Sequence, residues 1–397
     1  MKALLFGERG TAARSDVLPG LAFLKQVDVP TPDLPGGDWV VVKSRIAGIC
    51  GSDLGTLQGK PAPLLEPFFS SQPYVLGHEL FGTIESTGAR AGDLRPGQRV
   101  VVDPTLACSE RGFAPACAQC AANRPALCER SGEGRLAPGL LIGGCPDTGG
   151  GWGEYFVASA GRVHRVPDEI DDDEASLVEP FSVCLRPALE HRPEPGDLVV
   201  VLGAGMIGLM SVAALKAVEP RCRVVAVAKY PFQAQCAELL GADHVIDATA
   251  DDVVDQIGAL AQSRVYKLSS GGSVLRAGVP LVHDSVANRS TLDLALRITR
   301  GAGKIVLLGL PSALNDLDWT VAVVKEIQIV GSLMYGSEAF EGGPRPTFAR
   351  ALELLRSRRV DLRAIRPRTY PIEEYTEALQ DAATKTGRDA IKISFAF

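Results

Sequence analysis

The segment of residues 198–215, LVVVLGAGMIGLMSVAAL, constrains the fold of this chain most strongly. It contains 18 residues without a charge, which is at the lower limit of a transmembrane helix. However, it begins with a β-branched run and then has three closely spaced glycines, Gly203, Gly205 and Gly208. We therefore interpret it as a buried strand, a tight turn and a buried helix, and we expect no membrane span.

The glycines form a GxGxxG pattern between the expected strand 198–202 and the expected helix 209–218. This is the context in which the pattern binds a dinucleotide. Gly203 permits the turn, Gly205 lets the backbone approach a pyrophosphate, and Gly208 lets helix and strand pack closely. The helix N-terminus offers free N–H groups and a positive dipole end to the phosphates. The predicted cofactor-binding residues are Gly203, Ala204, Gly205, Met206, Ile207 and Gly208.

The next expected strand, residues 223–227, bears on the choice between NAD and NADP. In an NAD site an acidic residue about 20 positions after the glycines binds the ribose 2′-OH. Here Ala228 and Lys229 follow the strand. The missing carboxylate removes a repulsion of the NADP 2′-phosphate, and Lys229 could pair with that phosphate. The site therefore favours NADP over NAD, the alternative being that Lys229 is a solvated loop lysine.

The rest of the chain divides by pattern. Strands and helices alternate through the second half, which predicts βαβ units and a parallel sheet. The first third is β-rich, with Pro and Gly between short runs. After residue 335 we expect a helix at 346–356, a strand at 368–370, a helix at 372–383 and a final strand IKISF. The Pro-rich residues 55–73, including Phe68 and Phe69, are either a surface connection or part of a substrate pocket wall.

Composition excludes several classes of protein. The 397 residues suffice for two or three domains. Lys and Arg total 41 against 47 Asp and Glu, which gives a net charge of −6. This balance does not favour binding to nucleic acid or to an anionic membrane. Nine cysteines are too few for a disulfide-built fold. The first residues, MKALLFGERG, contain no signal-peptide core, so we expect a cytoplasmic protein.

Four cysteines lie within 21 positions, which favours metal binding over disulfides. They are Cys108, Cys117, Cys120 and Cys128. A second set of thiolate, imidazole and carboxylate groups suits a catalytic zinc, which takes three protein ligands and keeps a position open. This set is Cys50, His78, Glu79 and Glu179. Isolated residues of these types are usually structural, and only their flanking patterns single them out.

Those patterns resemble the zinc-dependent alcohol dehydrogenases of the medium-chain dehydrogenase/reductase superfamily. The resemblance is carried by GICGSD around Cys50, GHE-x2-G-x5-G from Gly77, SLVEPFSV around Glu179, and GAGMIG. It continues through VVKEIQIVGS to KISF and so covers nearly the whole chain. It implies an α/β fold in which a GroES-like β-rich catalytic domain, 1–186 and 336–397, accompanies a doubly wound Rossmann domain, 187–335.

The resemblance also implies residue roles. Cys50, His78 and Glu179 match the ligands of the catalytic zinc, in the polyol- and threonine-dehydrogenase-like version that has glutamate as third ligand. Glu79 matches a carboxylate beside the metal that can enter its coordination. Ser52 matches the hydroxyl that contacts substrate oxygen and starts a proton relay, and Asp53 the carboxylate that orients the histidine ligand.

The cysteine cluster matches the family's structural zinc lobe with one departure. The family pattern is Cys-x2-Cys-x2-Cys-x7-Cys, whereas eight residues separate Cys108 from Cys117. We expect that loop to bring Cys108 back to complete a four-thiolate site, with Cys145 as the spare ligand. Cys184, Cys222 and Cys236, like Cys145, otherwise look like ordinary thiols.

The expected activity is reversible oxidation of an alcohol to a carbonyl, with hydride transfer to NADP or NAD. The ligand set favours a secondary alcohol, polyol or amino alcohol as the small-molecule substrate. The family implies a homodimer or homotetramer, with no nucleic acid or membrane partner. Two alternatives stay open: a zinc-independent quinone or enone reductase of the same superfamily, and a non-catalytic dinucleotide-binding protein.

Overall fold

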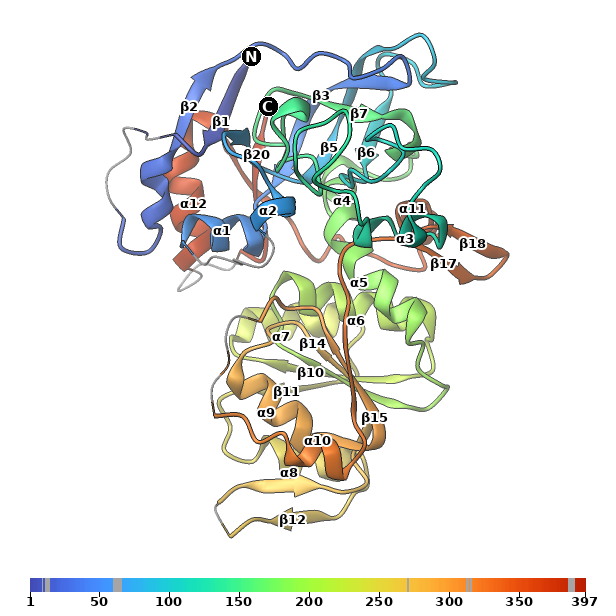
Figure 1. Cartoon of the computed structure of the whole chain (residues 1–397). Helices are drawn as coiled ribbons and strands as arrows, with labels where there is room; N and C mark the ends of the chain where they lie inside the picture. Colours follow the sequence, from blue (N-terminus) through green and yellow to red (C-terminus); the bar gives the residue numbers. More distant parts are fainter. Residues whose placement is uncertain are drawn as a thin grey trace.

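The structure, a computed structural model, describes residues 1–8, 10, 15–59, 66–269, 271–311, 314, 316–384 and 390–397. Figure 1 shows two lobes, one above the other, with both chain termini in the upper lobe. The chain crosses from the upper lobe to the lower lobe once and then returns. The lower lobe is therefore one continuous part of the sequence, as the alternating pattern of the second half predicts.

The lower lobe is built on a six-stranded parallel sheet with the order β11-β10-β9-β14-β15-β16. The strand bounds are β9 Leu198–Leu202, β10 Arg223–Ala228, β11 His244–Asp247, β14 Val279–Asp284, β15 Thr299–Leu307 and β16 Gln328–Gly331. Numbered within the lobe the order is 3-2-1-4-5-6, that of a doubly wound dinucleotide-binding fold. Its crevice for ligands lies where the order reverses, between β9 and β14.

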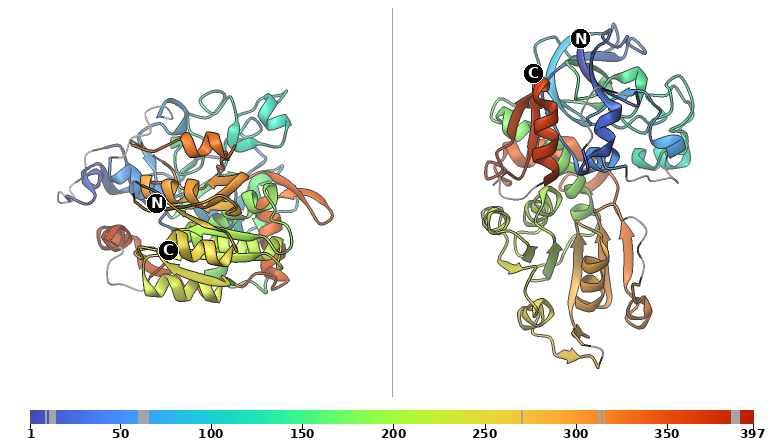
Figure 2. Two further views of the ribbon diagram at one scale, coloured as in Figure 1. Left: turned by 90° about the horizontal axis from the view of Figure 1, so that it is seen from below. Right: turned by 90° about the vertical axis from the view of Figure 1, so that its left-hand side faces the viewer.

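Helices lie on both sides of this sheet, as the right-hand view of Figure 2 shows. They are α6 Met206–Val218, α7 Pro231–Leu239, α8 Val253–Leu260, α9 Arg289–Ile298 and α10 Thr320–Val324. All five residues of β9 are buried, which explains why a continuous apolar run forms a central strand here. The strand, turn and helix predicted for residues 198–215 are confirmed, except that α6 begins three residues early, directly after its N-cap Gly205.

The upper lobe contains a seven-stranded sheet, β19-β20-β3-β5-β6-β8 with β7 on β3, and a three-stranded sheet, β2-β1-β4. The first sheet comprises β3 Trp39–Gly48, β5 Glu79–Thr87, β6 Arg99–Val102, β7 Tyr155–Ser159, β8 Val163–Arg165, β19 Arg368–Pro371 and β20 Ile393–Ala396. The second comprises β1 Lys2–Phe6, β2 Leu24–Asp28 and β4 Tyr74–Val75. The final strand β20 pairs with β3, so the end of the chain completes the sheet begun near its start.

The helices of the upper lobe connect these strands. They are α1 Gly51–Leu57, α2 Glu66–Phe69, α3 Ala118–Ala121, α4 Asp172–Ser176, α5 Val178–Glu190, α11 Thr347–Arg356 and α12 Tyr375–Thr384. Short 3-10 turns lie at Pro19–Phe23, Pro125–Leu127, Pro146–Thr148, Ala160–Arg162 and Ile372–Glu374. The expected helix at 346–356 and strand at 368–370 are confirmed. The expected helix at 372–383 is divided into the last 3-10 turn and α12.

Two antiparallel hairpins were not predicted. One joins β12 Val265–Lys267 to β13 Ser273–Leu275 in the lower lobe. The other joins β17 Ser337–Phe340 to β18 Gly343–Pro346 where the chain has returned to the upper lobe. Strands this short carry too few residues for an alternating pattern to be visible in the sequence.

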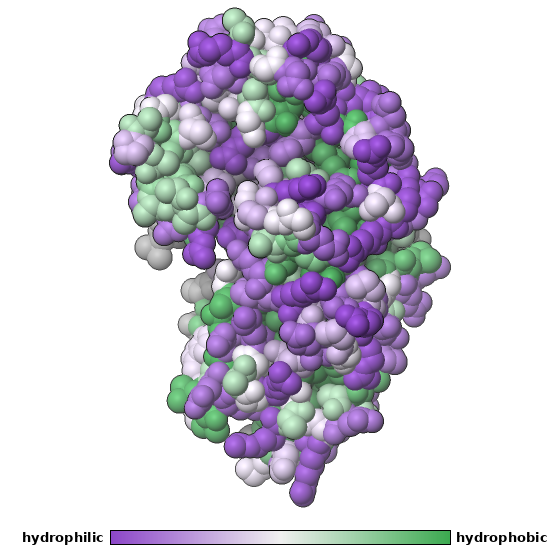
Figure 3. Space-filling model, turned by 90° about the vertical axis from the view of Figure 1, so that its right-hand side faces the viewer, coloured by the Kyte–Doolittle hydropathy of each residue, from purple (hydrophilic) through white to green (hydrophobic). Residues whose placement is uncertain are grey.

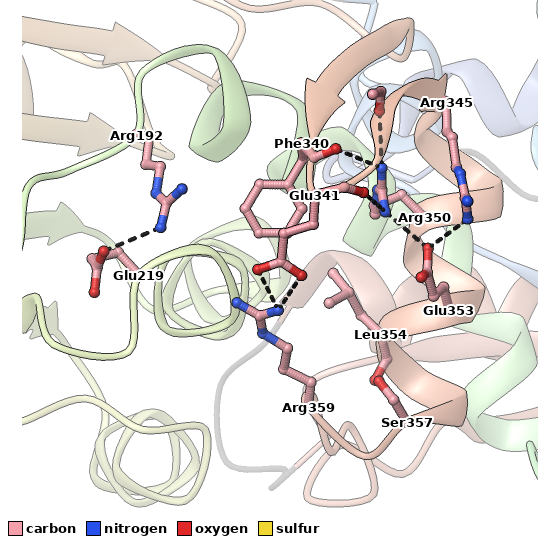
Figure 4. A network of polar contacts seen from close by, with 11 residues as sticks. Arg192, Glu219, Phe340, Glu341, Arg345, Arg350, Glu353, Leu354, Ser357 and Arg359 are labelled. Atoms are coloured by element: carbon pink, nitrogen blue, oxygen red, sulfur yellow. Dashed lines mark hydrogen bonds and ion pairs between the residues drawn. The ribbon is translucent and has the colours of Figure 1, made fainter.

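The second hairpin is fixed by arginines, as Figure 4 shows. The Phe340 ring lies between the guanidinium groups of Arg192, Arg350 and Arg359, at 5.4–5.5 Å from its centroid. Arg350 also donates to the carbonyl oxygens of Phe340 and Glu341. Because Arg192 lies on the link from α5 to β9, these contacts connect the hairpin with the start of the lower lobe.

The predicted domain boundaries remain a prediction. Position 187 lies inside α5, and position 335 lies between β16 and β17. Among the described residues, none of the helices is long and apolar enough to cross a membrane. The face in Figure 3 accordingly mixes hydrophilic and hydrophobic residues over both lobes.

Candidate functional site

Asp53 joins two of the predicted metal ligands. It lies on the first turn of α1, and its Oδ2 accepts a hydrogen bond of 2.9 Å from the backbone N–H of Cys50, the N-cap of that helix. Its Oδ1 lies 3.3 Å from Nδ1 of His78. The Asp53 carboxylate thus holds the His78 ring by one nitrogen and leaves Nε2 as the nitrogen that can bind a metal.

The side chain of His78 is 13% exposed in this group. Burial by itself lowers its pKa, but the neighbouring Asp53 and Cys50 outweigh burial and hold that pKa well above its usual range. The Cys50 thiol lies within hydrogen-bonding reach of the ring. Ser52, the predicted proton-relay hydroxyl, is half-buried on the same turn of α1.

The glycine before His78 is required by packing. Gly77 has φ +93°, and a Cβ there would lie 2.3 Å from the Trp152 ring. Trp152 is fully buried and donates through Nε1 to the carbonyl oxygen of Gly48. The glycine of the GHE pattern therefore fixes the backbone at the start of β5, and this sets the positions of His78 and Glu79.

Glu79 is buried against Lys392, which comes from the other end of the chain. The Lys392 ammonium group contacts both carboxylate oxygens and also donates to the carbonyl oxygen of Ile49, at 3.1 Å. A Cβ at Gly48 would overlap the Glu79 carboxylate, so a glycine is needed there. Both side chains of the pair are at most 3% exposed, and a buried charge of this kind requires such a partner.

Glu179 lies on the first turn of α5 and faces the same group. Burial raises the pKa of its carboxyl to about 7, and the nearby charge of Glu79 adds to the rise. Its Oε1 accepts a hydrogen bond from the hydroxyl of Tyr335, a fully buried residue between β16 and β17. The structure thus places Glu179 near His78 and Glu79, and Cys50 near His78, although the ligand atoms of these four residues are not drawn together as those of the four clustered cysteines are.

A zinc ion fits the chemistry of this group, since thiolate, imidazole and carboxylate are its usual ligands. Cys50, His78 and Glu179 are the residues that would hold it. In the structure, however, Glu179 is bonded to Tyr335 and Glu79 to Lys392. Entry of Glu79 into the coordination sphere would require its ion pair with Lys392 to break.

The four clustered cysteines are already arranged for a metal. Their sulfur atoms all lie within 4.8 Å of one another, and within the described ranges no other set of three or more His, Cys, Asp or Glu residues is arranged to hold an ion. The Sγ atoms of Cys108 and Cys128 are 3.7 Å apart. Two sulfurs bound tetrahedrally to zinc at about 2.3 Å lie about 3.8 Å apart. The cluster therefore fits a structural zinc site.

The long loop after Cys108 does bring that residue to the cluster, and Cys145 stays outside it. The Cys145 thiol donates to the carbonyl oxygen of Ala137 instead, and burial raises its pKa to about 11. Within the loop, Arg111 is 1% exposed and donates to carbonyl oxygens of Leu106, Glu133, Leu136, Ala137 and Gly139. These contacts hold the loop in place around the four sulfurs.

The glycine turn of the lower lobe has the geometry that phosphate binding requires. Gly203 has φ +87°, and a Cβ at Gly208 would lie 1.8 Å from the Gly203 carbonyl oxygen. A Cβ at Gly205, by contrast, would meet no atom within 4 Å, so the space before the N-terminus of α6 is open. Ser285, which follows β14, donates to the carbonyl oxygen of Leu202 at 2.7 Å and so links the ends of β9 and β14 at the switch point.

At the end of β10, Ala228 is buried and Lys229 is exposed. The ammonium group of Lys229 lies 5.6 Å from the centroid of the Tyr230 ring, and none of the ion pairs found among the described residues involves it. Residues 60–65 of the Pro-rich segment 55–73 lie outside the described residues, so its role as a pocket wall stays open. Phe68 is exposed and Phe69 is half-buried.

The fold combines a GroES-like part with a Rossmann-type part, as in zinc-binding dehydrogenases. The model of the alcohol dehydrogenase GroES-like domain matches residues 36–168, and that of the zinc-binding dehydrogenase matches residues 207–356. The chain belongs to the zinc-dependent alcohol dehydrogenase family of the medium-chain dehydrogenase/reductase superfamily. It is accordingly an NAD(P)-dependent alcohol oxidoreductase.

Individual proteins are similar to this chain over most or all of its length, the two solved structures in their fold. Sorbitol dehydrogenase of Bacillus subtilis is 28% identical over 363 residues, which are 90% of each chain. An alcohol dehydrogenase of Escherichia coli CFT073, crystallised with NADH, superposes with a TM-score of 0.75 at 24% identity, covering 100% of this chain and 99% of the other. A zinc-binding dehydrogenase of Sinorhizobium meliloti 1021, bound to NADP, has a TM-score of 0.73 at 24% identity with the same coverage.

Two residues of the site were missed by the sequence analysis. Tyr335 and Lys392 contact Glu179 and Glu79 from segments 156 and 313 positions away. Lys392 lies in KIS, within the region of family resemblance, but nothing in its surroundings singles it out. A charged residue before a short apolar strand is usually solvated, and only the pairing of β20 with β3 brings this one inside.

Proposed function

We propose that this enzyme is a zinc-dependent dehydrogenase acting on a secondary alcohol, a polyol or an amino alcohol and on the matching carbonyl compound. The observation that supports it most is the group formed by Cys50, His78 and Glu179, in which Asp53 orients the histidine. In this proposal these three residues hold the catalytic zinc, and Glu79 lies beside it. The domain division at 186/187 and 335/336 belongs to the same proposal.

The residues would act as follows. Zinc held by Cys50, His78 and Glu179 would supply Lewis acidity, and a nicotinamide cofactor would supply the acceptor or donor of the hydride. Ser52 accepts the alcohol proton and passes it toward solvent. The turn from Gly203 to Gly208 binds the cofactor pyrophosphate at the N-terminus of α6. Cys108, Cys117, Cys120 and Cys128 hold a structural zinc that keeps their lobe folded.

The glutamate proposed as third ligand supports this substrate class. A glutamate at position 179, in place of a cysteine, is the ligand of the polyol- and threonine-dehydrogenase-like members. The sorbitol dehydrogenase to which the chain is similar acts on a polyol by its name. This supports a polyhydroxylated or amino-substituted secondary alcohol over a simple primary alcohol.

We infer that NADP is preferred over NAD. The supporting observation is that Ala228 ends β10 without a carboxylate and that the exposed Lys229 follows it. A lysine there can pair with the 2′-phosphate, and β10 itself ends without a carboxylate that would repel that phosphate. The bound cofactors of the two structural neighbours differ and do not decide between the alternatives.

For assembly and location we propose a homodimer or homotetramer in the cytoplasm. Among the described strands β16 has no partner on its outer side, and nearby Trp319, Val323 and Val324 are 50%, 75% and 62% exposed. An open strand edge beside apolar side chains is suited to pairing with a second copy. All nine cysteines are free, which agrees with a reducing compartment.

The test is a panel of alcohols, polyols, amino alcohols and carbonyl compounds with NADP and NAD. Turnover is followed at the nicotinamide absorbance, with zinc content measured on the same sample. Zinc-dependent turnover of one of the secondary alcohols supports the proposal. Reduction of quinones or enones by zinc-free protein would favour the zinc-independent reductase, and tightly bound cofactor with no turnover would favour a non-catalytic binding protein.

A further inference from the structure

The hydroxyl of Tyr335 donates a hydrogen bond to Oε1 of Glu179. The tyrosine is 1% exposed and the glutamate 5%, so water does not compete for this contact. Glu179 begins the helix along which the chain leaves the upper lobe, and Tyr335 lies on the segment by which the chain returns to it. The contact therefore joins the two crossings between the lobes at a predicted metal ligand.

The returning segment is held on both sides of Tyr335. Before it, the carbonyl oxygen of Leu333 accepts a bond of 2.7 Å from Arg186, which projects from the same helix as Glu179. After it, Gly336 exchanges backbone and side-chain hydrogen bonds with Thr347. The Tyr335 ring packs edge-on against Phe348 with centroids 4.8 Å apart. The phenol is thus fixed in position independently of Glu179.

A carboxylate that binds a metal through one oxygen has the other free to accept a hydrogen bond, and such an outer partner orients the ligand. In this site Tyr335 occupies Oε1, while the carboxylate is close to His78 and Glu79. We propose that Tyr335 is a positioning residue that orients Glu179 as a one-oxygen ligand of the catalytic metal. This inference rests on the proposed function, because it assumes that Glu179 is a ligand.

The test uses cobalt(II) as the probe in the full-length chain freed of metal. The Glu179→Ala variant gives the absorption of the four-cysteine site alone, and its spectrum is subtracted from the others. In Tyr335→Phe, which removes one oxygen atom, we expect cobalt binding at the catalytic site to weaken about ten- to a hundredfold. We also expect the ligand-field bands of the remaining bound cobalt to shift.

Tyr370→Phe is the matched control. Tyr370 is also buried, and its hydroxyl donates to the carboxylate of Asp381 at 2.7 Å, away from the predicted ligands. Loss of the Tyr370 hydroxyl should leave the cobalt affinity and the cobalt spectrum as in the wild type. Because both variants remove a buried phenol–carboxylate bond, a general effect on packing would appear in both.

The outcomes separate the two claims. In one outcome Glu179→Ala loses one metal site, and Tyr335→Phe binds cobalt at least as tightly as the wild type and with the same spectrum. That outcome refutes the role of Tyr335 and leaves the proposed function standing. If Glu179→Ala keeps both metal sites with the wild-type spectrum, the proposed ligand set itself is wrong.

Discussion

The ammonium group of Lys392, the residue before the last strand β20, and the carboxylate of Glu79 on β5 form a buried ion pair. Lys392 also donates to the carbonyl oxygen of Ile49, next to Cys50. The pair thus lies against the backbone that presents the first predicted metal ligand. The charge of Glu79 outweighs burial and raises the pKa of Lys392, so the lysine is charged.

Removing one partner of this pair should lower the stability of the folded protein. In Lys392→Met the Glu79 carboxylate is left buried without its cation, and we expect a loss of about 3–5 kcal/mol in the free energy of unfolding. Adding Glu79→Gln to that variant should restore part of the loss, because the buried charge is then gone. Equilibrium denaturation of the three proteins is the measurement. A single variant as stable as the wild type would contradict the prediction.

The proposed catalytic ligands should be separable from the fold. In Cys50→Ala and in Glu179→Ala we expect loss of one zinc ion and of turnover, while circular dichroism shows a folded chain, because each substitution removes a ligand without opening a large cavity. Metal analysis and activity are measured on one preparation. Cys184→Ala, a buried thiol on the same helix as Glu179, is the control and should retain the zinc. Full activity of metal-free Cys50→Ala would contradict the assignment of Cys50 as a catalytic ligand.

Cys108 should be needed for the structural zinc and Cys145 should not. The sulfur of Cys108 lies in the cluster, whereas the thiol of Cys145 donates to a backbone carbonyl oxygen. We therefore expect Cys108→Ser to lose the structural zinc and to unfold at a lower temperature, since that metal contributes to folding directly. Cys145→Ser should keep the zinc content of the wild type. Equal zinc content in the two variants would disprove the distinction.

The end of β10 should set the cofactor preference. Ala228→Asp introduces a charge that repels the 2′-phosphate, and one such contact at about 4 Å is worth about 1–4 kcal/mol. We expect the ratio of kcat/KM for NADP to that for NAD to fall about tenfold or more. Lys229→Ala should lower kcat/KM for NADP and leave that for NAD unchanged, which serves as its internal control. If both cofactors respond equally, these residues do not contact the 2′ position.

His283 should make the protein sensitive to acid. It is fully buried on β14, where burial, helped by His191, lowers its pKa from 6.5 to about 3. Below pH 6.5 the unfolded chain binds a proton that the folded chain does not, so stability falls as the pH falls toward about 3. The slope reaches about 1.4 kcal/mol per pH unit for one group.

The measurement is denaturation at a series of pH values between about 6.5 and 5. His283→Leu should lose stability less steeply in acid than the wild type. His244→Gln changes an exposed histidine at the start of β11 and should leave the slope as it is. Parallel curves for the wild type and His283→Leu would show that His283 does not contribute.

Much of the fold could be predicted because the deciding patterns are local. The run that forms β9, the glycines and α6 lie within 21 consecutive residues, and each step follows from hydrophobicity and backbone freedom. The cysteine spacing likewise indicated a metal cluster without any tertiary information. By contrast, hairpins such as β17–β18 have strands of four residues, too short for a pattern to emerge.

The sequence by itself determined the dinucleotide-binding turn, the family resemblance and the identities of the candidate ligands, because these depend on residue types at short, fixed spacings. Only the tertiary structure decided which side chains surround those ligands. Tyr335 reaches Glu179 because the chain leaves the upper lobe along α5 and returns to it through the segment that contains Tyr335, and Lys392 reaches Glu79 because β20 pairs with β3. A contact between segments this far apart depends on how sheets and lobes pack, and no local pattern in the chain encodes it.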